Sequence, residues 1–79
     1  MRITVANERG LMYNLEVSED MDLGSFKALC EVETMIPSGQ ISLLFEGKEL
    51  LDDSKPLNLF NIRDGEVLLS KRTLFRLKI

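Results

Sequence analysis

The sequence has no histidine, no tryptophan and only one cysteine, Cys30, in 79 residues. Histidine is the side chain most often used as a general acid or base near neutral pH, and it is a common zinc ligand. A single cysteine cannot form an internal disulfide, and no metal-ligand spacing accompanies it. We therefore interpret Cys30 as a core thiol, and expect no enzymatic activity, no cofactor and no metal.

Long apolar runs are also missing. No stretch approaches the roughly 18 apolar residues that a membrane span requires, and the N-terminus lacks the basic-then-apolar layout of a signal peptide. The composition, 44% hydrophobic and 29% charged, is typical of a globular protein. We expect one small domain with no membrane partner, located in the cytoplasm or the nucleus.

Acidic residues are absent from the last nine positions, which contain the cations Lys71, Arg72, Arg76 and Lys78. Residues 1–70 therefore hold six cations against thirteen anions, a formal charge of about −7. A body of this charge repels nucleic acid and favours a basic protein partner, although solubility alone could also explain it. We expect no nucleic-acid binding.

Alternating apolar residues predict two strands at the start of the chain. Met1, Ile3 and Val5 share one face of a strand over 1–6. After turn residues that include Gly10, a second strand over 12–17 places Tyr13, Leu15 and Val17 inward.

A helix is predicted from Leu23 to Thr34, with Asp22 as its N-cap. Leu23, Phe26 and Cys30 form the buried stripe, with Leu29 at its flank. Val32 lies off this stripe, and Pro37 disfavours further helix.

Further strands follow the helix. A strand over 40–45 places Ile41 and Leu43 inward and Leu44 outward, and a turn at Glu46-Gly47 ends it. Leu50, Leu57, Phe60 and Ile62 are expected to fill the core from short strands and turns.

The last strand opens after Asp64-Gly65, and its register decides which leucine is exposed. We favour Leu69 outward, with Leu68 and the polar Ser70 inward; a slip of one residue would expose Leu68 instead. A hairpin, a helix and then more strands predict an α+β protein of the β-grasp type, a mixed sheet packed on one helix.

The stretch from Ile36-Pro37 through Leu44-Phe45-Glu46-Gly47-Lys48 to Leu50 resembles ubiquitin. The similarity continues back to Met1 and, with one extra residue near Asp52-Asp53-Ser54, forward to Ile62. The helix from Phe26 to Glu33 also resembles the N-terminal domain of the DNA-damage-inducible (Ddi) family of shuttle proteases. This resemblance implies a ubiquitin-like domain over residues 1–72 and a tail over 73–79.

The resemblance also implies a docking surface. Its predicted partner-binding residues are Leu44, Gly47, Lys48, Leu69 and Lys71. Three positions depart from ubiquitin's surface: Glu8 and Lys71 replace a leucine and a valine, and Ser42 replaces an arginine, which predicts a different partner preference. A second, helix-side patch of Leu29, Val32 and Met35 is possible.

Members of the Ddi family combine this domain with an aspartic protease, whose Asp-Ser/Thr-Gly triplet does not occur here. The resemblance implies a monomeric, non-catalytic domain of a ubiquitin–proteasome shuttle that docks on ubiquitin or on proteasomal receptors. The alternative is a scaffold domain of another multidomain protein, which binds a non-ubiquitin partner through its helix side. Conjugation to other proteins is excluded for this sequence because it contains no Gly-Gly pair.

The tail departs from the polar linker expected in the family. Phe75, Leu77 and Ile79 could extend the last strand, fold back onto the helix at Val32 and Leu29, or form an intermolecular edge. The tail could also derive from a cloning vector or from alternative splicing.

Overall fold

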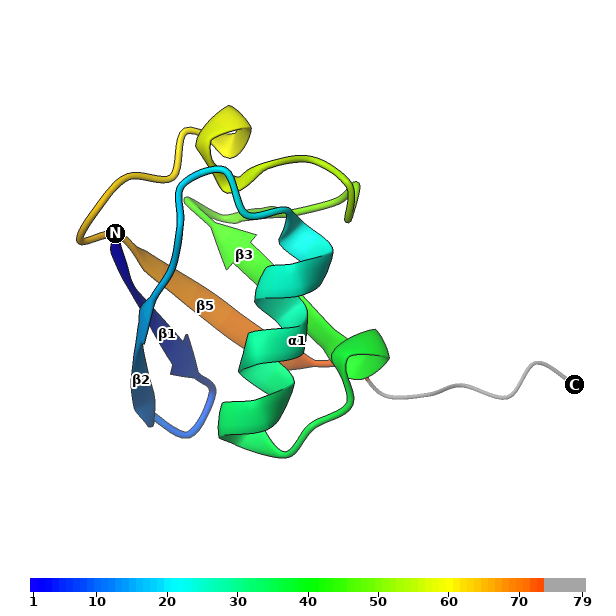
Figure 1. The fold of residues 1–79 in the computed structure, drawn as a ribbon. Helices are drawn as coiled ribbons and strands as arrows, with labels where there is room; N and C mark the ends of the chain where they lie inside the picture. Colours follow the sequence, from blue (N-terminus) through cyan, green and yellow to red (C-terminus); the bar gives the residue numbers. More distant parts are fainter. Residues whose placement is uncertain (74–79) are drawn as a thin grey trace, which may run out of the picture.

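A five-stranded mixed sheet carries one long helix on one of its faces in the computed structural model, which describes residues 1–73 (Figure 1). The strands lie in the order β2-β1-β5-β3-β4. The elements in chain order are β1 (Arg2–Asn7), β2 (Met12–Glu16), α1 (Leu23–Thr34), the 3-10 helix η1 (Ser38–Gln40), β3 (Ile41–Phe45), β4 (Lys48–Glu49), the 3-10 helix η2 (Leu57–Phe60) and β5 (Val67–Arg72). This arrangement confirms the predicted α+β fold.

Strands β1 and β2 form the predicted antiparallel hairpin, in which Ile3 pairs with Leu15. The side chain of Asn7 closes the hairpin loop, because its Oδ1 accepts hydrogen bonds from the backbone N–H groups of Arg9 and Leu11, both at 2.9 Å. Gly10 has a φ of +83°, a conformation that glycine adopts without steric cost.

Helix α1 has the predicted bounds and the predicted N-cap. The Asp22 carboxylate accepts a hydrogen bond of 2.7 Å from the backbone N–H of Ser25. At the other end, Met35 takes a left-handed conformation and its N–H donates to the Glu31 carbonyl at 2.8 Å. The helix therefore ends at Thr34, three residues before Pro37.

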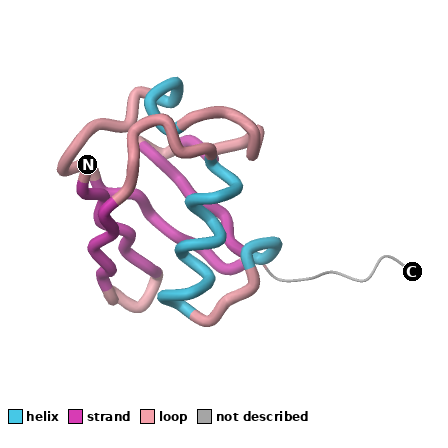
Figure 2. Tube along the Cα trace, viewed as in Figure 1, coloured by secondary structure: helices cyan, strands magenta, loops and turns pink. Residues whose placement is uncertain are grey.

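The loop before η2 is tied to the first turns of α1. Lys27 forms an ion pair of 3.0 Å with Asp53. The backbone N–H of Gly24 donates to the Asp53 carbonyl at 2.8 Å, and the N–H of Leu23 donates to the Lys55 carbonyl at 3.0 Å. Figure 2 shows this long loop beside the upper end of the helix.

The core lies between α1 and the facing side of the sheet, and it contains the residues that the sequence placed there. Its buried apolar members are Ile3, Val5, Leu15, Val17, Leu23, Phe26, Cys30, Ile41, Leu43, Phe45, Leu50, Leu57, Ile62 and Leu68. Tyr13 is half-buried, and Phe60 and Leu29 are partly buried against this cluster. The predicted core is thus confirmed, except that Phe60 lies at its margin and Tyr13, predicted inward, lies outside the cluster.

Strand β5 runs through the middle of the sheet, parallel to β1 and antiparallel to β3. Leu68 is fully buried, Leu69 is 38% exposed and Ser70 is 3% exposed. The favoured register of this strand is therefore confirmed, including its inward serine.

Three differences from the sequence prediction concern short elements. Strand β4 and both 3-10 helices were not predicted, and the strand boundaries differ by one or a few residues. The Glu46-Gly47 turn joins β3 to β4, and both of its residues have positive φ, 54° and 81°, as a two-residue hairpin turn requires.

The predicted tail begins at Thr73, whose N–H donates to the Gln40 carbonyl at 2.6 Å and so continues the pairing of β5 with the segment before β3. The predictions for Phe75, Leu77 and Ile79 lie outside the described residues. Between residues 1 and 73, no helix has both the length and the apolar content that a membrane crossing needs.

Candidate functional site

The face of the sheet opposite α1 carries a row of side chains whose register positions cross all five strands. Leu69 is the register partner of Leu44 on one side and of Ala6 on the other. Ala6 in turn pairs with Met12, and Leu44 pairs with Glu49. We name the apolar residues of this face, Ala6, Met12, Leu44, Val67 and Leu69, the outer strip.

Leu44 and Leu69 form the centre of the outer strip. They are directly opposite each other on adjacent antiparallel strands, where Cβ atoms are typically about 4.5–5.5 Å apart. Leu69 is exposed, but Leu44 is only half-buried instead of fully exposed as parity predicted. The reason is its central position, since neighbours on β5 and β4 cover its flanks.

The other predicted members of the site lie at the edges of this face. Lys71 is exposed and pairs with Ser42, next to the Leu44–Leu69 pair. Gly47 lies in the turn after β3, and Lys48 is the register partner of Phe45. The structure thus brings Leu44, Leu69 and Lys71 together, whereas Glu49 and not Lys48 is the register neighbour of Leu44.

A polar cluster borders the strip beside Leu44. The Ser42 hydroxyl donates to the Glu49 carboxylate at 3.2 Å, and it lies 2.7 Å from the Thr73 hydroxyl. Ser42 stands at the position where the resemblance places an arginine of ubiquitin. Its hydroxyl holds the Glu49 carboxylate at this position. This edge of the strip therefore carries both the Glu49 carboxylate, which can accept hydrogen bonds from a cationic partner group, and the exposed Lys71 opposite Ser42.

Sequence reasoning missed Met12, Ala6 and Val67 as members of the exposed apolar face. Met12 is 66% exposed and Val67 is 53% exposed. The sequence does predict that Met12 and Val67 point outward, because Met12 alternates with the inward Tyr13 and Val67 shares the parity of Leu69. It does not predict that these residues lie close together, since their proximity depends on β5 lying between β1 and β3.

The predicted helix-side patch is less continuous. Val32 and Met35 are 74% and 86% exposed. Leu29 is half-buried and packs against the core cluster, so much of its surface is unavailable to a partner. Whether this patch binds anything stays a prediction.

The thiol of Cys30 is placed for packing. It is 1% exposed on the buried stripe of α1, and burial, with a smaller effect from Glu33, raises its pKa to about 12. A thiol that stays protonated at neutral pH is a poor nucleophile. Within residues 1–73, no group of three histidine, cysteine or acidic side chains is arranged to hold a metal ion.

Part of this chain is similar in sequence to one segment of longer known proteins. A 60-residue segment is 35% identical to protein DDI1 homolog 2 of Danio rerio and 30% identical to that of Homo sapiens. In both comparisons the match covers 76% of this chain and 15% of the relative, so the chain spans only a small part of these proteins. The predicted resemblance to the Ddi family is confirmed.

The fold has a close counterpart among solved structures. The UBL domain of Plasmodium falciparum Dsk2 superposes with a TM-score of 0.86 over 92% of this chain and 97% of that domain, at 22% sequence identity. Such a likeness establishes a shared ubiquitin-like fold. The sequence pattern described as the ubiquitin family matches residues 3–73, nearly all of the described chain. The chain therefore belongs to the ubiquitin family.

Proposed function

We propose that this chain is a non-catalytic docking domain of a ubiquitin–proteasome shuttle protein in the cytoplasm or the nucleus. Its partner is ubiquitin or a proteasomal receptor for ubiquitin-like domains, and the contact is made by the outer strip. The similarity to DDI1 homologs over the ubiquitin-like region supports this class of role.

The observation that carries the proposal is the direct pairing of Leu44 with Leu69 on the solvated face. These two aliphatic side chains lie between Ala6 on β1 and Glu49 on β4, and they form a shallow apolar surface. A partner can place an apolar side chain of a helix or loop on such a surface. A small interface of this kind gives weak and reversible binding, which suits a shuttle.

The charges at the border of the strip support a basic partner surface. Glu49 lies beside Leu44, and residues 1–70 together carry about −7. Opposite charges at the rim of an interface mainly raise the association rate and select among partners. Ubiquitin presents a basic face, so it fits Glu49, whereas Lys71, the register partner of Ser42 on the same side of the strip, disfavours a partner that is basic at that point.

Binding measurements on matched leucine variants test the proposal. We expect Leu69→Ala to weaken binding to ubiquitin, or to an isolated proteasomal receptor subunit, by roughly tenfold, because a central interface leucine is worth about 1–2 kcal/mol. The control is Leu59→Ala, since Leu59 is 62% exposed but lies in η2, outside the strip. Equal affinities for the two variants would reject the outer strip as the docking surface.

A further inference from the structure

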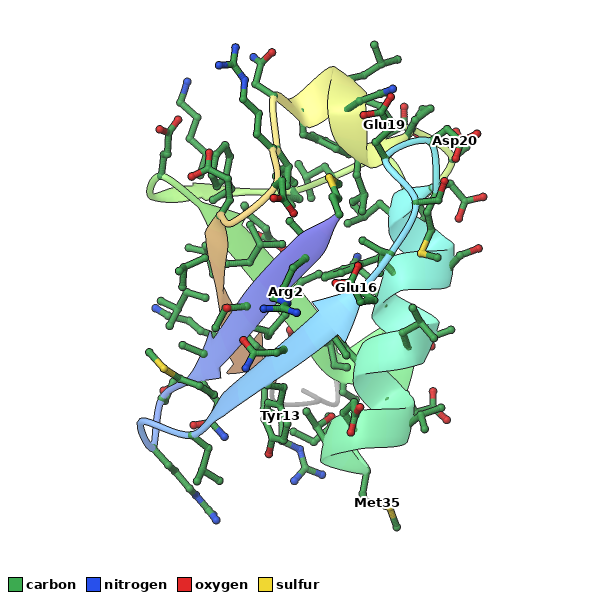
Figure 3. All side chains as sticks on the ribbon, turned by 60° about the vertical axis from the view of Figure 1, so that its left-hand side comes forward. Arg2, Tyr13, Glu16, Glu19, Asp20 and Met35 are labelled. Carbon is green, nitrogen blue, oxygen red and sulfur yellow. The ribbon has the colours of Figure 1, made fainter. Side chains whose placement is uncertain are left out.

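An open cleft of about 540 Å³ lies on the helix side of the molecule, away from the outer strip. It is formed where the β1–β2 loop, the C-terminal end of α1 and the end of β5 meet. Its lining residues are Asn7, Glu8, Arg9, Leu11, Tyr13, Thr34, Met35, Ile36, Ser70 and Arg72. In Figure 3, Tyr13 extends from β2 toward the same end of the molecule as Met35.

The apolar part of the lining comes from separate segments. Leu11 is exposed at the end of the hairpin loop, and Tyr13 and Ile36 are half-buried. Met35 adds an exposed thioether side chain, which adapts readily to differently shaped partners. Together they offer an apolar surface that no residue described in the structure fills.

Ser70 also lines the cleft. It is the one buried polar residue among residues 1–73, at 3% exposed, and it occupies an inward position of β5 whose neighbour two residues earlier is the core residue Leu68. A serine is much smaller than the aliphatic side chains at the other inward positions. The small side chain leaves the cleft open where a leucine would extend into it.

The charge of the lining is opposite to that of the rest of the domain. Arg9 and Arg72 stand against one acid, Glu8, whereas residues 1–70 carry about −7. The ion pairs among the described residues involve neither arginine. Arg72 donates from Nε to the Gln40 amide oxygen at 3.2 Å, and no other residue among 1–73 accepts a hydrogen bond from its side chain, so its terminal N–H groups can bind a carboxylate.

We propose that this cleft is a second docking site, which binds a short acidic segment of a partner protein that carries one large apolar side chain. The apolar side chain packs among Leu11, Tyr13 and Ile36, and the adjacent carboxylates pair with Arg9 and Arg72. Guanidinium groups suit this task because they bind carboxylates through two parallel hydrogen bonds. The site is independent of the proposed ubiquitin or receptor contact.

The two surfaces can be occupied together because they lie on opposite sides of the same strands. Leu69 faces the outer strip and its neighbour Ser70 faces the cleft. The same alternation separates Met12 from Tyr13 on β2. A domain with this arrangement can bridge two partners.

The test uses the isotope-labelled 79-residue chain and two capped peptides, Glu-Asp-Leu-Phe-Asp-Glu and its counterpart with lysine at every acidic position. We expect the acidic peptide to shift the amide resonances of Leu11, Tyr13, Ile36 and Ser70, and the basic peptide to leave them unchanged. Arg72→Glu should weaken the acidic peptide at least tenfold. Lys71→Glu is the matched control, since it makes the same charge change on the opposite side of β5, and it should have little effect.

A second variant tests the shape of the site. Ser70→Leu should close the floor of the cleft and abolish the shifts, while Ser70→Ala should preserve them; each variant's amide spectrum shows whether it is folded. The proposal is overturned if the acidic peptide causes no shifts at about 1 mM, the weak limit of specific binding at about −4 kcal/mol. Equal losses from Arg72→Glu and Lys71→Glu would overturn it as well.

Discussion

Leu43 and Leu69 show how the position of a residue along a strand divides stability from binding. Leu43 is fully buried in the core, and Leu69 is exposed on the opposite face of the sheet. We expect Leu43→Ala to lower the free energy of unfolding by about 2–5 kcal/mol, because it leaves a cavity in a small core. Leu69→Ala should cost less than about 1 kcal/mol.

Urea unfolding of both variants, followed by circular dichroism, measures this difference. If the outer strip is the docking surface, Leu69→Ala loses binding while it stays nearly as stable as the original chain. A loss of several kcal/mol from Leu69→Ala would mean that this leucine is a structural residue, and its effect on binding could then be indirect.

Alternation along β5 left two registers open, one with Leu69 outward and one with Leu68 outward. The burial of Leu68 and Ser70 and the exposure of Leu69 confirm the favoured one. Alternation could not predict that Leu44 is half-buried, since the cover comes from strands that are distant in the sequence. Alternation also does not explain why the inward residue Ser70 is polar and small. The structure suggests a reason, because Ser70 lines the cleft.

At the scale of the element, the N-cap of α1 couples stability to pH. The pKa of Asp22 is lowered because its carboxylate accepts hydrogen bonds from the side chain and backbone of Ser25. A carboxyl group with a lower pKa in the folded state stabilises that state above its unfolded pKa, near 3.9. This stabilisation is lost as the pH falls through the lower, folded pKa.

We therefore expect the stability of the domain to decline below about pH 4, and Asp22→Asn to make the decline shallower. Asparagine keeps the capping acceptor but does not titrate. Part of the decline should remain, because the pKa of Asp52 is also lowered, by hydrogen bonds from Ser54. Urea midpoints measured between pH 5 and pH 2 test this expectation; superimposable curves for the two proteins would contradict it.

Long elements were predicted well and short ones were not. Helix α1 was recognised because a cap, a buried stripe and a following proline all agree. Strand β4 has two residues and exists only through its pairing with β3, so it has no periodicity to detect. The same holds for η1 and η2, of three and four residues.

At the scale of the whole molecule, the sheet order creates both candidate surfaces. Because β5, the last strand, is inserted between β1 and β3, it brings Leu69 between Ala6 and Leu44. It also brings Ser70 and Arg72 to the loop that follows β1. The resemblance to ubiquitin predicted the centre of the outer strip, but its extension to Met12 and the existence of the cleft required the three-dimensional arrangement.

We proposed that a ubiquitin–proteasome partner docks on the outer strip. The most direct measurement is to titrate unlabelled ubiquitin, and separately a proteasomal receptor subunit, into the isotope-labelled chain and follow its backbone amide resonances. We expect at least one partner to shift the resonances of Ala6, Met12, Leu44 and Leu69 as one cluster. Shifts confined to the helix side around Val32 and Met35, or none with either partner at about 1 mM, would contradict it.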